Sequence, residues 1–204
     1  HEPDLSISDI TYLKDCIKDN TVSSVGMFIK KFENKIASLT KAKYVVATNS
    51  GTSALHISCI LMNIQKNDEV IVPSFTFVGT ANAVKYCGGI PHFVDIEESH
   101  FGINVKKLAD HLKKIVIKKK NICINKLTGR RIKAIIPVHV FGHCMKINEL
   151  TKLAKKYNLL IIEDAAEALG SYYNKKHAGT FGNIGVLSFN GNKTITCGTG
   201  GAIL

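Results

Sequence analysis

The chain has 204 residues, of which 45% are hydrophobic, so it can bury one sizeable core and has the length of one or two domains. Its formal net charge is +11, but many lysines lie in predicted helical stretches such as residues 106–120 without interleaved aromatics, which argues against a nucleic-acid-binding protein. No apolar run approaches the roughly 18 residues of a membrane span, and residues 1–20 lack the apolar core of a signal peptide, so we expect a cytoplasmic protein.

Apolar runs and amphipathic segments alternate along the chain from residue 44 onward. We expect strands at residues 44–50, 68–75, 89–96, 131–140, 159–166 and 184–187. We expect helices at residues 52–62, 76–86, 104–116 and 147–158, and a hairpin over residues 121–134 that turns at Thr128-Gly129. This alternation predicts an α/β fold with a mainly parallel sheet covered by helices on both faces.

The cysteines and histidines give little sign of a metal site. The six cysteines lie far apart without a CxxC pair, as expected of free thiols in a reducing compartment. His139, His143 and Cys144 could converge on a metal only from a helix, whereas Pro137 and Gly142 predict a strand end followed by a loop. We therefore expect no metal.

Polar residues follow four of the predicted strands, where ligands gather in a parallel sheet. After the first strand, "NSGTS" (residues 49–53) places Gly51 and Thr52 at the start of a helix, where unpaired N–H groups and the helix dipole bind phosphate. The positive net charge would suit a phosphorylated ligand. The same residues also fit an ordinary helix cap, with Ser50 or Thr52 as the capping residue.

Three residues at other strand ends could complete such a site. Phe77 is either a core aromatic or a stacking platform. Asp164 closes a buried strand, and a buried carboxylate is costly unless a cation pairs with it. Lys193 lies in the polar run "NGNK" outside any amphipathic helix, and its amine would become a nucleophile if desolvated. Together, the cradle, the aromatic ring, the acid and the lysine match the phosphate, ring face, pyridine nitrogen and aldehyde of pyridoxal 5'-phosphate (PLP).

Other site classes fit these residues less well. A P-loop requires a glycine directly before its lysine, whereas Gly191 is followed by Asn192, and no GxGxxG follows a predicted strand. A non-catalytic domain that keeps the fold as a regulator or assembly partner is the alternative, although the presence of both Lys193 and Asp164 argues against it.

Several segments, in order along essentially the whole chain, resemble the nucleotide-sugar aminotransferase family (DegT/DnrJ/StrS type) of fold-type-I PLP enzymes. They are "VSSVGMFIKKFENKIASLT", "TNSGTSAL", "VPSFTFVGTANAV", "IIPVHVFG", "IIEDAAEALGS" and "GNIGVLSFNGNKTITCGTGGAI". The resemblance implies that Lys193 carries PLP covalently and that Asp164 pairs with its pyridinium nitrogen. It also implies that phosphate is held by Gly51, Thr52 and Ser188, that Phe77 stacks on the ring, and that Glu167 lies near the 3-hydroxyl.

The resemblance also implies a substrate and an assembly. Glu167 departs from the commoner Gln or His and resembles enzymes that aminate C4 of UDP-linked 4-keto-6-deoxy-N-acetylhexosamines, on the way to bacillosamine or legionaminic acid. Lys193 argues against the branch of dehydratases. We expect L-glutamate as amino donor and a homodimer with shared active sites. Residues 1–204 would form the PLP-binding large domain, including an N-terminal segment at residues 1–40, and we expect the family's smaller C-terminal domain to be absent from this chain.

Overall fold

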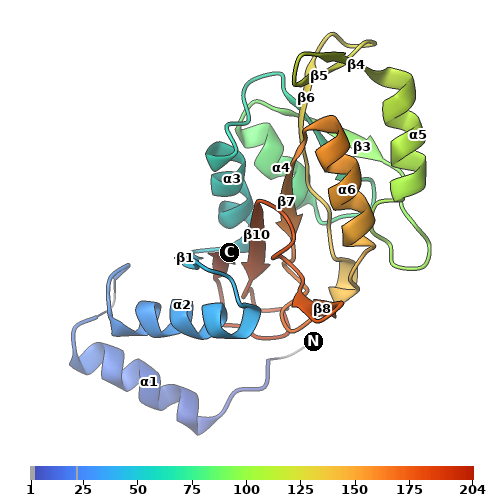
Figure 1. Ribbon diagram of the computed structural model, residues 1–204. Coiled ribbons are helices and arrows are strands. Elements are labelled where there is room, and N and C mark those ends of the chain that lie inside the picture. Colours follow the sequence, from blue (N-terminus) through green and yellow to red (C-terminus); the bar gives the residue numbers. More distant parts are fainter. Residues whose placement is uncertain (1–2, 22) are drawn as a thin grey trace.

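The computed structural model describes residues 3–21 and 23–204 and shows an α/β fold built on a nine-stranded sheet (Figure 1). The helices are α1 (Ile7–Lys18), α2 (Met27–Thr40), α3 (Gly51–Leu61), α4 (Val78–Tyr86), α5 (Val105–Ile115), α6 (Ile147–Tyr157) and the short 3-10 turn η1 (Val140–Gly142). The strands are β1 (Val46–Thr48), β2 (Glu69–Pro73), β3 (Ile90–Val94), β4 (Val116–Lys119), β5 (Ile122–Asn125), β6 (Arg131–Ile135), β7 (Leu160–Asp164), β8 (Tyr172–Tyr173), β9 (Lys176–His177), β10 (Ile184–Ser188) and β11 (Gly201–Ile203).

The centre of the sheet is parallel. Its main path runs β1-β11-β10-β7-β6-β2-β3, and the pairs from β10 to β3 are all parallel. Antiparallel strands are added at both sides, β11 and β1 beyond β10, and the β4–β5 hairpin beside β6. Because β10, β7, β6 and β2 point the same way, their carboxyl ends meet at one edge of the sheet.

Helices cover both faces of the sheet, which confirms the predicted fold class. Successive residues of a strand point to opposite faces, so Val70 and Val72 of β2 pack with α3 and α4, whereas Ile71 packs with α5 and α6. All of β2 is buried, which explains the continuous apolar run that follows Glu69 in its sequence. The N-terminal helices lie apart from these layers. In α2, Ile36 joins the core formed with Leu187 and Ala202, while α1 buries no residue.

The structure differs from the predicted elements in two places, at the first strand (residues 44–50) and after α5 (residues 116–120). The first strand is short, partly exposed and antiparallel to β11, an unpredicted strand. The apolar stripe of α5 (Leu108, Leu112 and Ile115) ends at Ile115, because the next helical positions would be lysines. Residues 116–119 therefore form β4, paired with β5, instead of continuing the helix. The predicted hairpin, by contrast, is present as β5 and β6.

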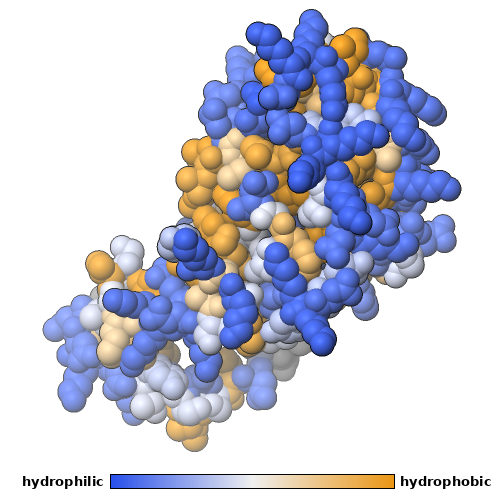
Figure 2. Space-filling model, viewed as in Figure 1, coloured by the Kyte–Doolittle hydropathy of each residue, from blue (hydrophilic) through white to orange (hydrophobic). Residues whose placement is uncertain are grey.

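The surface is uneven in polarity. Hydrophilic residues dominate the viewed face around α5, α6 and the β4–β5 hairpin, and apolar residues gather near α3 and α4 (Figure 2). Exposed apolar side chains on these two helices are Ile57, Ile60, Leu61, Val78 and Tyr86. Of the helices in the described part of the chain, none combines the length and apolarity that a membrane crossing needs.

Candidate cofactor-binding site

A cavity of about 520 Å³ lies at the carboxyl ends of the parallel strands. It contains every residue predicted for the site, namely Gly51, Thr52, Phe77, Asp164, Glu167, Ser188 and Lys193. These residues are up to 142 positions apart in sequence, so the fold alone brings them together. A second hollow of about 560 Å³, between the α2–β1 connection and the β8–β9 hairpin, includes none of them.

The start of α3 forms one wall of the cavity. Ser50 is the capping residue, and its Oγ accepts a hydrogen bond from the Ser53 N–H at 3.1 Å. Ser50, and not Thr52, therefore caps the helix. The N–H groups of the first turn point out of a helix without intrahelical partners, and those of Gly51 and Thr52 have no other hydrogen-bond partner among the described residues. This helix end can bind an anion.

Gly51 is required here by the close approach of a neighbouring strand. A Cβ at this position would lie 2.8 Å from the Cβ of Ser188 on β10. The Ser188 hydroxyl thus faces the start of α3 across a gap that a side chain would fill. Backbone amides from α3 and a hydroxyl from β10 together form a cradle of N–H and O–H donors, the groups that bind phosphate.

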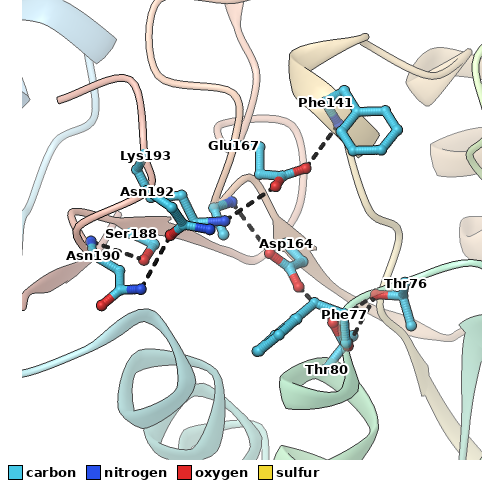
Figure 3. A network of polar contacts seen from close by, with 11 residues as sticks. Thr76, Phe77, Thr80, Phe141, Asp164, Glu167, Ser188, Asn190, Asn192 and Lys193 are labelled. Atoms are coloured by element: carbon cyan, nitrogen blue, oxygen red, sulfur yellow. Dashed lines mark hydrogen bonds and ion pairs between the residues drawn. The ribbon is translucent and has the colours of Figure 1, made fainter. Parts of the chain in front are cut away.

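Asp164 ends β7 at the floor of the cavity and is almost fully buried. Its Oδ2 accepts a hydrogen bond from the Thr80 hydroxyl at 2.7 Å, and its Oδ1 accepts one from the Ala166 N–H at 3.2 Å (Figure 3). Burial raises the pKa of the Asp164 carboxyl, an effect that outweighs the lowering by the Thr80 hydrogen bond and by the charge of Lys193. A protonated ring nitrogen would supply the cation that this carboxylate lacks.

Lys193 reaches into the cavity from the loop after β10 (Figure 3). Its Nζ lies 3.1 Å from Oε1 of Glu167, which follows β7. The other oxygen of Glu167, Oε2, accepts a hydrogen bond from the Phe141 N–H at 2.8 Å. Glu167 therefore holds the lysine amine while being held itself by the turn after β6.

Phe77 lies just before α4 with an extended backbone, and its side chain is 75% exposed. This exposure rules out the interpretation of Phe77 as a core aromatic. A Cβ at Gly79 would lie 3.0 Å from both the Phe77 ring and the Thr52 hydroxyl, so the ring stands close to the start of α3. Its face is available to a planar group in the cavity.

Sequence reasoning missed two residues that complete this geometry. Thr80 bonds Asp164, and Thr76 in turn bonds Thr80 at 2.8 Å. Phe141 supplies the N–H that fixes Glu167.

The side chain of His139 is directed to Glu163, at 3.0 Å, instead of joining His143 and Cys144. Within residues 3–21 and 23–204, no group of three or more histidine, cysteine or acidic side chains could hold a metal ion.

The donor set fits PLP part by part. The α3 cradle suits the phosphate, the Phe77 ring suits the ring face, buried Asp164 suits the pyridinium nitrogen, and Lys193 is the one lysine that lines the cavity in the described part of the chain.

The DegT/DnrJ/EryC1/StrS aminotransferase family matches the chain over residues 3–204. The GDP-perosamine synthase of Escherichia coli O157:H7 is 38% identical over 100% of this chain and 52% of its own length. EpsN of Bacillus subtilis, provisionally described as a pyridoxal phosphate-dependent aminotransferase, is 34% identical over 99% of this chain and 50% of its own. Among solved structures, an aminotransferase from Psychrobacter cryohalolentis is similar with a TM-score of 0.87 and 28% identity, covering 100% of this chain and 48% of that one.

The chain therefore belongs to the DegT/DnrJ/EryC1/StrS aminotransferase family, and the predicted family and PLP as its cofactor are confirmed. The chain spans about half the length of the curated relatives it matches.

Proposed function

We propose that this member of the DegT/DnrJ/EryC1/StrS family is the PLP-binding part of an enzyme that moves an amino group from L-glutamate to a nucleotide-linked keto-sugar. One observation carries the proposal: the anion-binding start of α3, a buried carboxylate and a lysine amine line the same cavity at the carboxyl edge of the sheet. A regulatory domain without chemistry would have no need to keep Lys193 and Asp164 facing one space.

Each residue has a stated role in this proposal. PLP, when bound, supplies an aldehyde that bonds amines and a ring that accepts electrons. Lys193 would hold the cofactor covalently, and its free amine would take up and return a proton at Nζ in each half-reaction. Asp164 keeps the ring nitrogen protonated. Gly51, Thr52 and Ser188 bind the phosphate.

The two remaining residues position these groups. Phe77 packs on the ring face and limits the access of water from that side. Glu167 orients the Lys193 amine through the 3.1 Å contact, and the same carboxylate would lie near the 3-hydroxyl.

The proposed amino-group acceptor is a nucleotide-linked 4-keto-6-deoxy sugar, whose nucleotide could be UDP or GDP. Glu167 favours C4 of a UDP-linked 4-keto-6-deoxy-N-acetylhexosamine, by resemblance. The relative from Escherichia coli O157:H7 is named for a GDP-linked sugar, perosamine. Assaying the complete protein with L-glutamate and matched UDP- and GDP-linked 4-keto-6-deoxy sugars separates these possibilities, because the preferred nucleotide would show the higher kcat/KM.

The organisation of the whole enzyme is also a proposal. We infer that residues 1–204 are the large domain, that a smaller C-terminal domain completes the protein, and that two subunits share each active site. The half-length match to relatives and the open polar loops around the cavity support this. If each site is shared, a loop of one subunit contacts the phosphate bound by its partner. Mixing inactive Lys193→Ala subunits with subunits altered in that loop should then partly restore activity. A monomer that sediments as such and is fully active would contradict shared sites. The free thiols fit a cytoplasmic enzyme.

The assignment of Lys193 is tested by chemical labelling. Borohydride reduction of the PLP-loaded complete protein, followed by peptide mapping, should place the pyridoxyl group on Lys193. Lys193→Ala should lose the label, whereas Lys152→Ala, which removes an exposed lysine of α6, should keep it. A label on another lysine in the unaltered protein would overturn the assignment, and failure to bind PLP would favour the non-catalytic alternative.

A further inference from the structure

Three phenylalanines form a row beside the proposed cofactor site. Phe75 follows β2, Phe101 follows β3 and Phe141 follows β6, and these three strands are neighbours in the sheet. The Phe75 ring lies 5.8 Å from that of Phe101 and 6.2 Å from that of Phe141, measured between centroids. All three side chains are exposed, by 45%, 39% and 66% respectively. We name these residues the aromatic platform.

Two of these rings are held by an unfavourable backbone. Phe101 has φ +56° and Phe141 has φ +53°, in the left-handed region that bulky residues rarely adopt. Every other non-glycine residue with positive φ in the described part of the chain is an asparagine or a lysine. Because left-handed phenylalanine is strained and such strain concentrates at ligand clamps, the positions of these two rings call for a functional reason.

The turn that carries Phe141 is fixed from the active-site side. Its N–H donates to Glu167, and Gly142 follows at φ +82°, where a Cβ would lie 3.0 Å from the Glu167 carbonyl oxygen. Glu167 also contacts the Lys193 amine at 3.1 Å, so this one side chain lies between the platform and the amine proposed to react. Figure 3 shows the Phe141 ring on the far side of Glu167 from Lys193.

The platform lies outside the space that the cofactor needs. The groups assigned to PLP come from α3, β7, β10 and the start of α4, whereas the platform extends from β6 through β2 to β3. Phe75 and Phe141 nevertheless line the same cavity. A ligand that reaches Lys193 from this direction must pass over uncharged aromatic faces.

We propose that the aromatic platform is the subsite for the acceptor keto-sugar, whose apolar C–H face packs on the rings of Phe141 and Phe75. This proposal rests on the proposed function and adds the acceptor's place in the site. A sugar ring offers C–H groups to an aromatic face while its hydroxyls stay towards water. The proposed amino donor, L-glutamate, carries two carboxylates at neutral pH, and these gain nothing from the faces of aromatic rings.

The test compares Phe75→Ala and Phe75→Leu with Phe93→Ala in the complete PLP-loaded protein. Phe93 is an exposed phenylalanine of β3 that does not line the cavity, so it is a matched control. Two readouts are followed: the rate at which L-glutamate converts the PLP form, seen by its visible absorbance, and the dissociation constant of the nucleotide-sugar by calorimetry. Phe75→Ala should weaken nucleotide-sugar binding at least tenfold, leave the L-glutamate step within twofold, and be partly rescued by Phe75→Leu.

Three results would overturn the proposal. A slowed L-glutamate step would mean that the ring positions Lys193 and not the sugar. An equal loss of affinity for free GDP or UDP would place the nucleotide on the platform. A dissociated dimer in sedimentation with unchanged sugar affinity would assign the platform to the subunit interface. If the unaltered protein transfers no amine from L-glutamate, the proposed function fails, but the calorimetric comparison of the variants still decides the subsite.

Discussion

Replacing Thr80 with valine isolates the hydrogen bond that supports Asp164. Valine keeps the shape of threonine but removes the hydroxyl that donates to Asp164 Oδ2 at 2.7 Å. Thr80 is fully buried, so water cannot replace the lost donor. A hydrogen bond to a charged group contributes about 1.5–3 kcal/mol, so the PLP-free protein should lose that much unfolding free energy at pH 8. Urea unfolding measures it.

The pH dependence of this loss gives a sharper test. Burial raises the pKa of Asp164 above its unfolded value of 3.8, so between these values the folded protein binds more protons than the unfolded chain. Asp164 therefore lowers stability as the pH rises through that window. The penalty of Thr80→Val should be largest at pH 8 and shrink as the pH falls, because a neutral carboxyl needs its donor less.

The control for this experiment is Thr76→Val. This variant removes the hydroxyl that contacts Thr80 but leaves the hydrogen bond between Thr80 and Asp164. This variant should lose less stability and show no such pH dependence. A penalty for Thr80→Val that does not shrink as the pH is lowered from 8, or a penalty no larger than that of Thr76→Val, would refute the reasoning that Thr80 stabilises an ionised Asp164.

Two further substitutions test the cradle and the acid. Gly51→Ala places a Cβ 2.8 Å from that of Ser188 and should raise the PLP dissociation constant about tenfold or more, measured by fluorescence, whereas Gly191→Ala, with only a 3.9 Å contact, should not. Equal PLP affinities of the two variants would show that the start of α3 does not bind the cofactor's phosphate. Asp164→Asn should keep PLP bound but lower turnover by about 10²–10³-fold, because a neutral partner no longer holds the ring nitrogen protonated; near-normal turnover would exclude Asp164 from the chemistry.

The central sheet could be predicted because its strands are buried on both faces. Val70–Val72 and the apolar run of β7 are continuous in sequence, as parallel strands between helices must be. The added antiparallel strands could not be predicted in this way. β11 is three residues long and begins at Gly201, where a Cβ would lie 2.5 Å from the Ser50 backbone, so its pairing depends on a close approach invisible in the sequence.

The same distinction applies to the site. Asp164 and Lys193 could be proposed because each follows a strand end, which is a local pattern. Thr80 bonds a residue 84 positions away and Phe141 one 26 positions away, so neither contact has a signature in its own segment. The exposure of Phe77 arises because α4 begins at Val78 and not at Thr76, which leaves the preceding residues outside the helix packing.

Three features of the site's own residues each cost stability when taken alone. Asp164 is a buried carboxylate without a hydrogen-bonded cationic side chain in the described ranges, the N–H groups of Gly51 and Thr52 have no protein acceptor there, and Phe77 exposes an aromatic ring. One ligand with a cationic ring nitrogen, a phosphate and a planar face would satisfy all three. Since a ligand that binds only the folded state adds about 2.7 kcal/mol at one hundred times its dissociation constant, the cofactor would stabilise the fold through the same contacts that prepare it for reaction.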